Sequence, residues 1–321
     1  MHPLPLWRAR VLVAMAAALA ACATAADGDA ARPLQVADGV WMLRGVPGEI
    51  GPENGGRVGN AGFIVGPQGV LVIDSGVSYA QGRELLAAIA RTTSQPVKML
   101  VITHARQEFL FGAAAFRERG IPIRMHTKTA RLMAARCEGC LRTLQRTLGE
   151  EAMRGSAVVK PDATFDESET VTMIGRPVRL LYLGHGSGPG DVAVLDEPTR
   201  TLFAGGLLDN GRIPDVQDSQ LAGWAQALAA LRALQLVRIV PGHGAAAGPE
   251  LIATIERYLS ELQSRTRALL DADVGLSQVA DGVQLPAFAN WDQYETIHRR
   301  NASIVFLRQE QERLAKEGTN R

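Results

Sequence analysis

The chain has 321 residues, 46% of them hydrophobic and 21% charged, so it is long enough to bury a large core in one large domain or two small ones. Its formal net charge is only +1, and no long run of one sign occurs along it. Nucleic acid is therefore not an expected partner, because its binding requires a concentrated positive surface.

The N-terminus has the pattern of an export signal. Arg8 and Arg10 precede an apolar stretch at residues 11–21, which is too short to span a membrane. Leu-Ala-Ala-Cys at residues 19–22 resembles a bacterial lipobox, in which Cys22 becomes the lipidated first residue of the mature protein. The alternative is ordinary cleavage near Ala26, with Cys22 discarded. Residues 1–26 thus read as a signal peptide of lipoprotein type. We expect the mature protein on the periplasmic side, attached to a bacterial membrane only through a lipid anchor, or else soluble in the periplasm.

Apolar runs and turn residues then predict a mixed α/β chain. Strands are expected at residues 40–43, 60–65, 70–73, 99–102, 121–125, 171–173, 178–183, 192–195, 201–204 and 237–240. Helices are expected at residues 78–91, 110–119, 127–148, 221–234, 251–270 and 291–316. The alternation of strands and helices predicts layers of sheet and helix around a common core.

Two cysteines lie inside the predicted helix at residues 127–148. Cys137 and Cys140 are one turn apart, so their side chains share one face of the helix. In an oxidising compartment a local disulfide is the plain expectation. A redox-active or free pair is the second possibility. A metal site is the third, but it needs two more ligands and only His126 is near in sequence.

The stretch from Met99 to Phe109 organises the chain. An apolar strand delivers His104 and further polar groups to a loop ahead of a helix, which is where metallohydrolases place their chemistry. Three later stretches have similar character: Gly-His-Gly-Ser-Gly-Pro-Gly-Asp at 184–191, Leu-Phe-Ala-Gly-Gly-Leu at 202–207 and Pro-Gly-His-Gly at 241–244. In this order they resemble the metallo-β-lactamase superfamily, whose hallmark is Thr-His-x-His-x-Asp-His at the end of such a strand.

The resemblance implies where two zinc ions would be held, and the first motif has lost part of that site. His104 stands on the first histidine of the hallmark, Arg106 on the second, Glu108 on the aspartate and Phe109 on the last histidine. A guanidinium cannot ligate a cation, and a phenyl ring has no donor atom. We expect Arg106 to pair with Glu108, which would satisfy the carboxylate without zinc.

The later motifs keep one implied ligand intact and change the others. Counting back from the aspartate at 191 places Ser187 where the family has a histidine, and His185 could serve only if the loop were remodelled. Gly206 replaces the aspartate that bridges both metals, and the nearby Asp209 is expected to point elsewhere. His243 matches the family pattern in full.

Asp74 ends an apolar strand in the sequence Asp-Ser-Gly. The resemblance implies that it lies beside the metal site and supports ligands without being one. The plainer alternative is that Asp74 caps the helix that begins near Ser78.

The fold implied by the resemblance is a four-layer αββα sandwich, of α+β or α/β class, over residues 34–273. Residues 274–321 are expected to form a C-terminal helical extension packed on the same domain. Residues 53–66, 212–215 and 298–301 look like an exported group called quinoprotein relay system zinc metallohydrolases, which is related to a sulfur-oxidation accessory protein. That resemblance implies a periplasmic setting near quinoprotein dehydrogenases.

Two functions remain open, and with them whether the protein is an enzyme. In one, it is a catalytically degenerate relative without a cofactor, whose old pocket, with Arg106, Phe109, Ser187 and Gly206, binds a small molecule or a periplasmic protein. In the other, it is a divergent hydrolase with at most one zinc, held by His104, His185 and His243, with Glu108 as fourth ligand or general base. The first is favoured because no residue compensates for the lost ligands and because Arg106 would repel a divalent metal.

Overall fold

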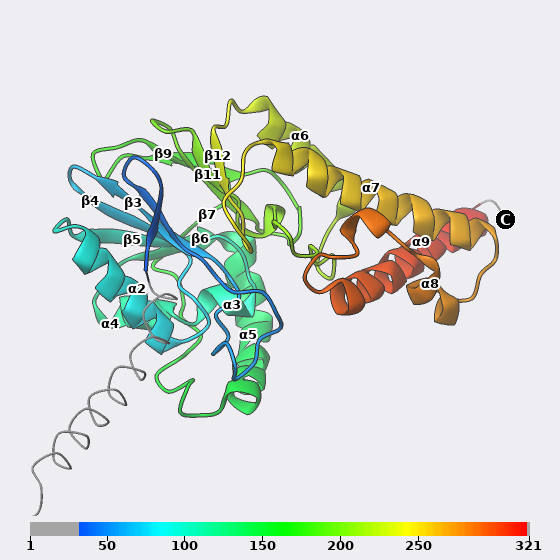
Figure 1. Ribbon diagram of the computed structural model, residues 1–321, viewed down its shortest axis with the longest axis horizontal. Helices are drawn as coiled ribbons and strands as arrows, with labels where there is room; N and C mark the ends of the chain where they lie inside the picture. Colours follow the sequence, from blue (N-terminus) through cyan, green and yellow to red (C-terminus); the bar gives the residue numbers. More distant parts are fainter. Residues whose placement is uncertain (1–31, 320–321) are drawn as a thin grey trace, which may run out of the picture. The chain divides into compact units, whose positions relative to one another are not determined.

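Two β-sheets form the centre of the fold (Figure 1). The structure, a computed structural model, describes residues 32–319, and the predicted signal peptide with Cys22 lies outside them. The seven-stranded sheet has the order β1-β2-β3-β4-β5-β6-β7, and the five-stranded sheet has the order β12-β11-β10-β9-β8. The strands are β1 Leu34–Ala37, β2 Val40–Leu43, β3 Ala61–Gly66, β4 Gly69–Ile73, β5 Val97–Ile102, β6 Ile123–His126, β7 Ala163–Phe165, β8 Glu169–Val171, β9 Val178–Tyr182, β10 Val192–Asp196, β11 Thr201–Phe203 and β12 Arg238–Val240.

The register of the larger sheet brings two polar loops to one edge. Strands β1 to β4 pair antiparallel, whereas β4, β5, β6 and β7 pair parallel. Ile73 in β4 lies opposite Val101 in β5, so the residues that follow these strands leave the sheet side by side. In the smaller sheet β11 and β12 are also parallel, and their loops leave together.

Helices cover the outer faces of both sheets, and the last two helices of the chain pack on the helix before them (Figure 1). They are α2 Tyr79–Thr92, α3 Gln107–Leu110, α4 Ala113–Glu118, α5 Thr127–Leu148, α6 Leu221–Ala233, α7 Glu250–Asp271, α8 Leu276–Gly282 and α9 Arg299–Thr319, with 3₁₀ turns η1 Gly205–Leu207 and η2 Pro286–Phe288 and the π-helical turn η3 Tyr294–His298. The amphipathic sequence of α2 begins after Ser78, whose side chain accepts a hydrogen bond from the backbone of Gln81. Ser78, and not Asp74, is therefore the helix cap.

Three apolar layers hold these elements together. Leu71 and Ile73 of the larger sheet pack against Val192 and Val194 of the smaller one. A second cluster joins the larger sheet to α2, α4 and α5, and a third joins the smaller sheet to α6, α7 and α9 (Figure 1). The order helix, sheet, sheet, helix confirms the predicted αββα sandwich.

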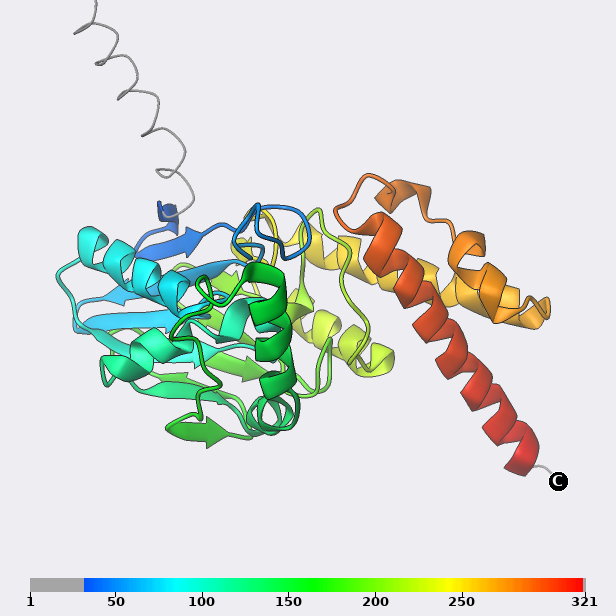
Figure 2. The ribbon, with the colours of Figure 1, turned by 90° about the horizontal axis from the view of Figure 1, so that it is seen from below.

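The segment after α7 packs as helices on the same body. Helix α9 lies against α7 and α8, as both views of the ribbon show (Figures 1 and 2). A buried network joins them: Tyr258 Oη is 3.1 Å from His298 Nδ1 and accepts a hydrogen bond of 3.0 Å from Asn301 Nδ2. Asn301 Nδ2 also donates to the carbonyl oxygen of Pro214, 2.7 Å away. The C-terminal helix thereby reaches the chain beside the polar loops.

Among the helices of residues 32–319, none is both long and apolar enough to cross a membrane.

Candidate functional site

The four motif loops converge at one edge of the sandwich. His104 follows β5, Glu108 and Phe109 lie in α3, Gly206 lies in η1 and His243 follows β12. Three of these loops, those with His104, Gly206 and His243, border a cleft of about 430 Å³, whose other walls include α5, the segment after η1 and the start of α9. A cleft of this size can hold a small molecule. The 184–191 loop lines a separate small pocket beside His104.

Phe109 packs against both implied histidine ligands. The centroid of its ring is 4.5 Å from that of His104 and 5.3 Å from that of His243. The distance between the two imidazole centroids cannot exceed the sum of these two distances, so the structure brings both histidines to one site, as predicted. Phe109 is fully buried, and Gly59 makes room for it, because a Cβ at Gly59 would lie 2.7 Å from the ring. An apolar ring thus contacts both imidazoles where the hallmark motif has its last histidine.

His104 is oriented from behind by Thr103 and Asp74. The Thr103 hydroxyl donates to Asp74 Oδ2 at 2.7 Å and lies 2.7 Å from His104 Nδ1, and the Thr103 backbone N–H donates to Asp74 Oδ1 at 2.9 Å. Because the hydroxyl proton goes to Asp74, the hydroxyl oxygen accepts from Nδ1–H, which leaves Nε2 of His104 as an acceptor. Burial raises the pKa of Asp74 to about 7 and lowers that of His104 to about 3. Asp74 supports the histidine through Thr103, in the place that the sequence predicted.

His243 is held between two carboxylates. Its Nδ1 lies 2.8 Å from Asp209 Oδ1, and its Nε2 lies 3.2 Å from Glu108 Oε1. The second contact is an ion pair without hydrogen-bond geometry, so Nε2 has no hydrogen-bond partner. Burial alone would lower the pKa of His243, but Asp209 and Glu108 outweigh it and raise that pKa. Burial opposes ionisation of Glu108 too, yet His243 and Arg106 hold its pKa at about 2. The two carboxylates thus favour the charged form of the His243 imidazole.

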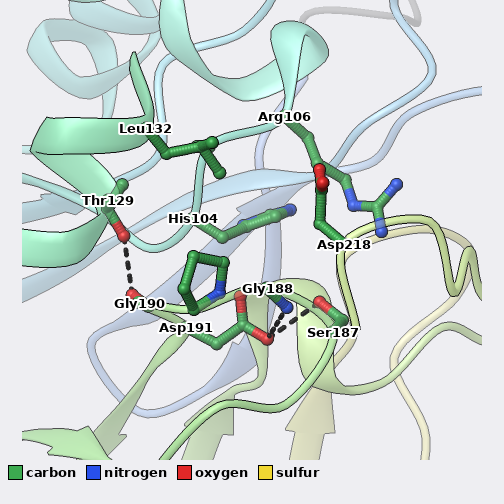
Figure 3. Close-up of a pocket in the computed structure, with 11 residues that line it drawn as sticks. His104, Arg106, Thr129, Leu132, Ser187, Gly188, Gly190, Asp191 and Asp218 are labelled. Atoms are coloured by element: carbon green, nitrogen blue, oxygen red, sulfur yellow. Dashed lines mark hydrogen bonds between the residues drawn. The ribbon is translucent and has the colours of Figure 1, made fainter. Parts of the chain in front are cut away.

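Arg106 turns away from the histidines, and the expected pair with Glu108 is wrong. Its Nη1 donates to Asp215 Oδ2 at 2.9 Å and its Nη2 donates to the Asp215 carbonyl oxygen at 2.8 Å. Arg300, from α9, donates to the same Oδ2 at 2.7 Å. In Figure 3 the guanidinium of Arg106 points away from His104. The reason is that Asp215 offers both a carboxylate and a carbonyl acceptor, whereas Glu108 is already taken by His243.

Ser187 stands where the family has a histidine in the motif at 184–191, as the Pro-Gly-Asp register predicted. Its hydroxyl donates to Asp191 Oδ2 at 2.8 Å, beneath His104 (Figure 3). A Cβ at Gly206 would lie 2.5 Å from Ser187 Oγ and 2.9 Å from His104 Cδ2. The space that a bridging aspartate would need is therefore taken by the neighbours of Gly206.

His185 does not join His104 and His243. Its Nε2 lies 2.6 Å from the backbone carbonyl oxygen of Asp218, to which it is bound. Over residues 32–319 no group of three or more histidine, cysteine, aspartate or glutamate side chains is arranged to hold a metal ion. The predicted trio of histidines is thus not assembled, because the loop at 184–191 keeps its register instead of being remodelled.

Zinc requires about three protein ligands, and the residues at this site do not fit it. His104 Nε2 and His243 Nε2 are buried without hydrogen-bond partners. These two nitrogen atoms are the implied zinc ligands that the site keeps. Phe109 and Gly206 offer no donor, and Ser187 is bound to Asp191. We therefore derive no catalytic step through a metal.

The two cysteines are free thiols instead of the expected disulfide. Cys137 is buried in the cluster beneath α5, whereas Cys140 is half-buried and borders the cleft. The Cys140 Sγ donates to the Arg136 carbonyl oxygen at 3.6 Å within the helix, as in a reduced thiol.

Some residues of the site could not be assigned from their motifs. Asp209 was expected to point elsewhere, but it orients His243. Asp215 and Arg300 belong to stretches singled out by resemblance, yet their contact with each other and with Arg106 had no signal in sequence spacing. The only sequence signal for this contact was that arginines in the C-terminal helix could pair with Asp215.

A family model described as the metallo-beta-lactamase superfamily matches residues 54–243, which is more than half of the chain. The chain belongs to this superfamily. The match begins in the Gly-rich loop that packs on Phe109 and ends at His243, so it spans all four motif loops.

Relatives in the metallo-beta-lactamase superfamily are distant. The linear primary-alkylsulfatase of Pseudomonas sp. (strain ATCC 19151) is 23% identical over 264 residues, covering 70% of this chain and 49% of the relative. A metallo-beta-lactamase type 2 of Bacillus sp. (strain 170) is 24% identical over 217 residues, covering 65% of this chain and 75% of the relative. The chain thus spans about half the length of the alkylsulfatase.

Solved structures agree with the fold. A metallo-beta-lactamase from Pontibacter korlensis has a TM-score of 0.59 at 22% identity, covering 71% of this chain and 98% of that one. One from Erythrobacter litoralis has a TM-score of 0.56 at 20% identity, covering 71% and 96%. At these identities the likeness shows the superfamily fold alone.

Proposed function

We propose that this protein is a member of the metallo-beta-lactamase superfamily that has lost metal-dependent hydrolysis and binds a small molecule in the cleft in front of the former metal positions. The observation that carries this proposal is that the protein's own side chains fill those positions while the cleft stays open. Phe109 packs against both His104 and His243, and a side chain at Gly206 would collide with Ser187. The cleft beside them has a volume of about 430 Å³.

Side chains of the protein supply the positive charge that a metal would otherwise bring. Asp209 and Glu108 favour the protonated form of His243, which would neutralise part of their charge. Arg106 and Arg300 share Asp215 on the wall of the cleft. These three carboxylates therefore need no divalent cation as a partner.

Metal analysis of protein purified without chelator tests the proposal. We expect far less than one zinc per chain and no shift in melting temperature on addition of a chelator. Phe109→His is the matched control, because it places a third nitrogen donor beside His104 and His243 and should create zinc binding. Stoichiometric zinc in the wild-type protein, lost in His104→Ala and in His243→Ala, would overturn the proposal and restore the hydrolase alternative.

Hydrolysis is the second readout. A chromogenic β-lactam and a primary alkyl sulfate represent the substrates named for the relatives. Wild-type protein should turn over neither probe faster than the His104→Ala variant, with or without added zinc. Turnover that depends on His104, Glu108 and His243 together would support a divergent hydrolase.

We also propose that the protein is exported and held on the periplasmic side by a lipid on Cys22. The support is the signal-like N-terminus, since those residues lie outside the described part of the chain. Cys22→Ala should release the protein from the membrane fraction or block its maturation. Unchanged membrane association in that variant would reject lipid attachment. The resemblance to the quinoprotein relay group suggests a periplasmic setting near quinoprotein dehydrogenases.

A further inference from the structure

One wall of the cleft has nucleophiles that the metal-site motifs do not include. Helix α5 presents Cys140 to the cleft, together with Thr143 and Thr147, across from Glu108. Cys137 lies one turn earlier, only 2% exposed, beneath Cys140 and packed in the apolar cluster with Met133 and Leu144. An accessible thiol therefore sits above a buried one at the surface where a ligand would bind.

A small tightening of the helical turn would bring the two thiols within bonding distance, because Cβ atoms three residues apart in a helix are about 5–6 Å apart and a disulfide has them about 4 Å apart. Residues three apart in an α-helix have Cα atoms about 5 Å apart, which is within the range of disulfides. Both are reduced in the structure. The hydrogen bond from Cys137 lowers the pKa of the Cys140 thiol to about 7, although burial opposes the shift, and Arg136 adds to it. The hydrogen bond to Cys140, together with burial, raises the pKa of Cys137, so Cys140 is the more readily ionised of the two thiols.

Gly139, between the thiols, is not explained by packing. A Cβ there would meet nothing closer than Arg142 Nη2 at 3.9 Å. A glycine inside a helix costs about 1 kcal/mol relative to alanine, so this residue weakens α5 without giving room to a neighbour. Its backbone freedom lets the turn between Cys137 and Cys140 adjust when their sulfur atoms approach.

We propose that Cys140 and Cys137 form a dithiol site that reduces a small disulfide ligand bound in the cleft. The Cys140 thiolate attacks one sulfur of the ligand, the ligand S–S bond breaks, and the first thiolate leaves and takes a proton from water. Cys137 then loses its proton to water and attacks Cys140 Sγ, which releases the second thiolate. The ligand gains two electrons, and the protein keeps a Cys137–Cys140 disulfide until a dithiol reductant restores it.

The shape of the site selects the ligand class. Cys140 borders a cleft of about 430 Å³ and is only half-buried, so a small disulfide can reach it, whereas a folded protein would have to insert a loop. Cys137 is 2% exposed, so it reacts with Cys140 and not with free ligand. The geometry gives the two cysteines separate roles in attack and release.

Peptide mapping after exposure to 2-hydroxyethyl disulfide tests the proposal on the full chain. Trypsin cuts after Arg136 and Arg142, so both thiols fall on one peptide, apart from Cys22. Wild-type protein should yield this peptide with an internal disulfide. Cys137→Ser should stop at a stable mixed disulfide on Cys140, and Cys140→Ser should react at least tenfold more slowly.

Gly139→Ala separates the chemistry from a structural role. It should raise the melting temperature, because alanine favours the helix, yet it should slow closure severalfold so that the mixed disulfide accumulates. Near-ultraviolet circular dichroism checks that each variant is folded. The proposal is wrong if Cys140→Ser reacts as fast as the wild type, if the wild type stops at the mixed disulfide, or if Gly139→Ala leaves closure unchanged.

Discussion

Arg106 is bound to Asp215, which lies in the segment after η1 on the wall of the cleft. Two hydrogen bonds of 2.9 and 2.8 Å fix the guanidinium against the carboxylate and the carbonyl oxygen of that residue. Burial opposes ionisation of Asp215, but Arg106 and Arg300 lower its pKa. The residue that replaces the second histidine of the hallmark motif is therefore part of the wall of the cleft and not of a metal centre.

Asp215→Asn should destabilise the protein by about 1–3 kcal/mol, because it leaves a largely buried guanidinium without its charged partner. Urea unfolding measures the change. Asp218→Asn is the control, since its pair with Arg136 is more exposed and should contribute less than about 1 kcal/mol. In double-mutant cycles Arg106→Met should couple strongly to Asp215→Asn and more weakly to Glu108→Gln. Stronger coupling to Glu108 would contradict the geometry.

Gly206→Ala should cost about 1–3 kcal/mol, because its methyl group would lie 2.5 Å from Ser187 Oγ. Ser187→Ala removes that atom at the expense of one hydrogen bond to Asp191. The double variant should therefore be more stable than the sum of the two single changes predicts. Thermal unfolding of the three proteins gives the comparison. Strict additivity would mean that Ser187 moves aside freely and that the site is looser than the structure indicates.

Asp74 should make stability depend on pH near neutrality. Its pKa is raised from 3.8 to about 7 by burial, so the folded state holds a proton that the unfolded state has lost over this range. The contribution of Asp74 to the free energy of unfolding is fully present below about pH 4 and is lost as the pH rises toward 7. At about 1.4 kcal/mol per pKa unit, the loss is at most about 4 kcal/mol. The unfolding free energy of the wild type relative to Asp74→Asn should fall between pH 5 and pH 8. A difference that stays flat or rises would show that Asp74 is ionised throughout.

Much of the fold was predictable because its signals are local. The helix predicted at residues 127–148 is α5, Thr127–Leu148, since its apolar period is uninterrupted and Gly149 follows. Strand β5 was predicted from a continuous apolar run, and its burial on both faces explains that run. The predicted tail helix at 291–316 begins three residues later, since Gln293 adopts a positive φ just before Tyr294. Its first turn is the π-helical turn η3, and α9 continues from it.

The site was less predictable because its contacts are between residues far apart in sequence. Spacing placed Ser187 and His104 correctly, since each is fixed by its own motif. It could not choose between Glu108 and Asp215 for Arg106, because local proximity favoured the first and only the fold brings the second within 2.9 Å. The thiols show the same limit: spacing placed Cys137 and Cys140 on one face, and packing decided that one is buried and one borders the cleft.

The C-terminal helix should control the wall of the cleft through Asn301. This fully buried side chain donates to the Pro214 carbonyl oxygen and accepts from the Val216 N–H at 3.2 Å, so it holds the chain on both sides of Asp215. Asn301→Ala should cost about 2–4 kcal/mol, because it leaves buried backbone groups unpaired.

Hydrogen exchange separates this local effect from a general loss of stability. The Val216 amide should exchange faster in Asn301→Ala even after correction for global unfolding, because its acceptor is gone. Thr254→Ala is the control: its one side-chain hydrogen bond lies within α7 and is exposed, so it should leave the Val216 amide unchanged. Unaltered exchange at Val216 in Asn301→Ala would mean that the segment is held by Arg106 and Arg300 alone. Faster exchange would make α9 the element that fixes Asp215, and through it the position of Arg106.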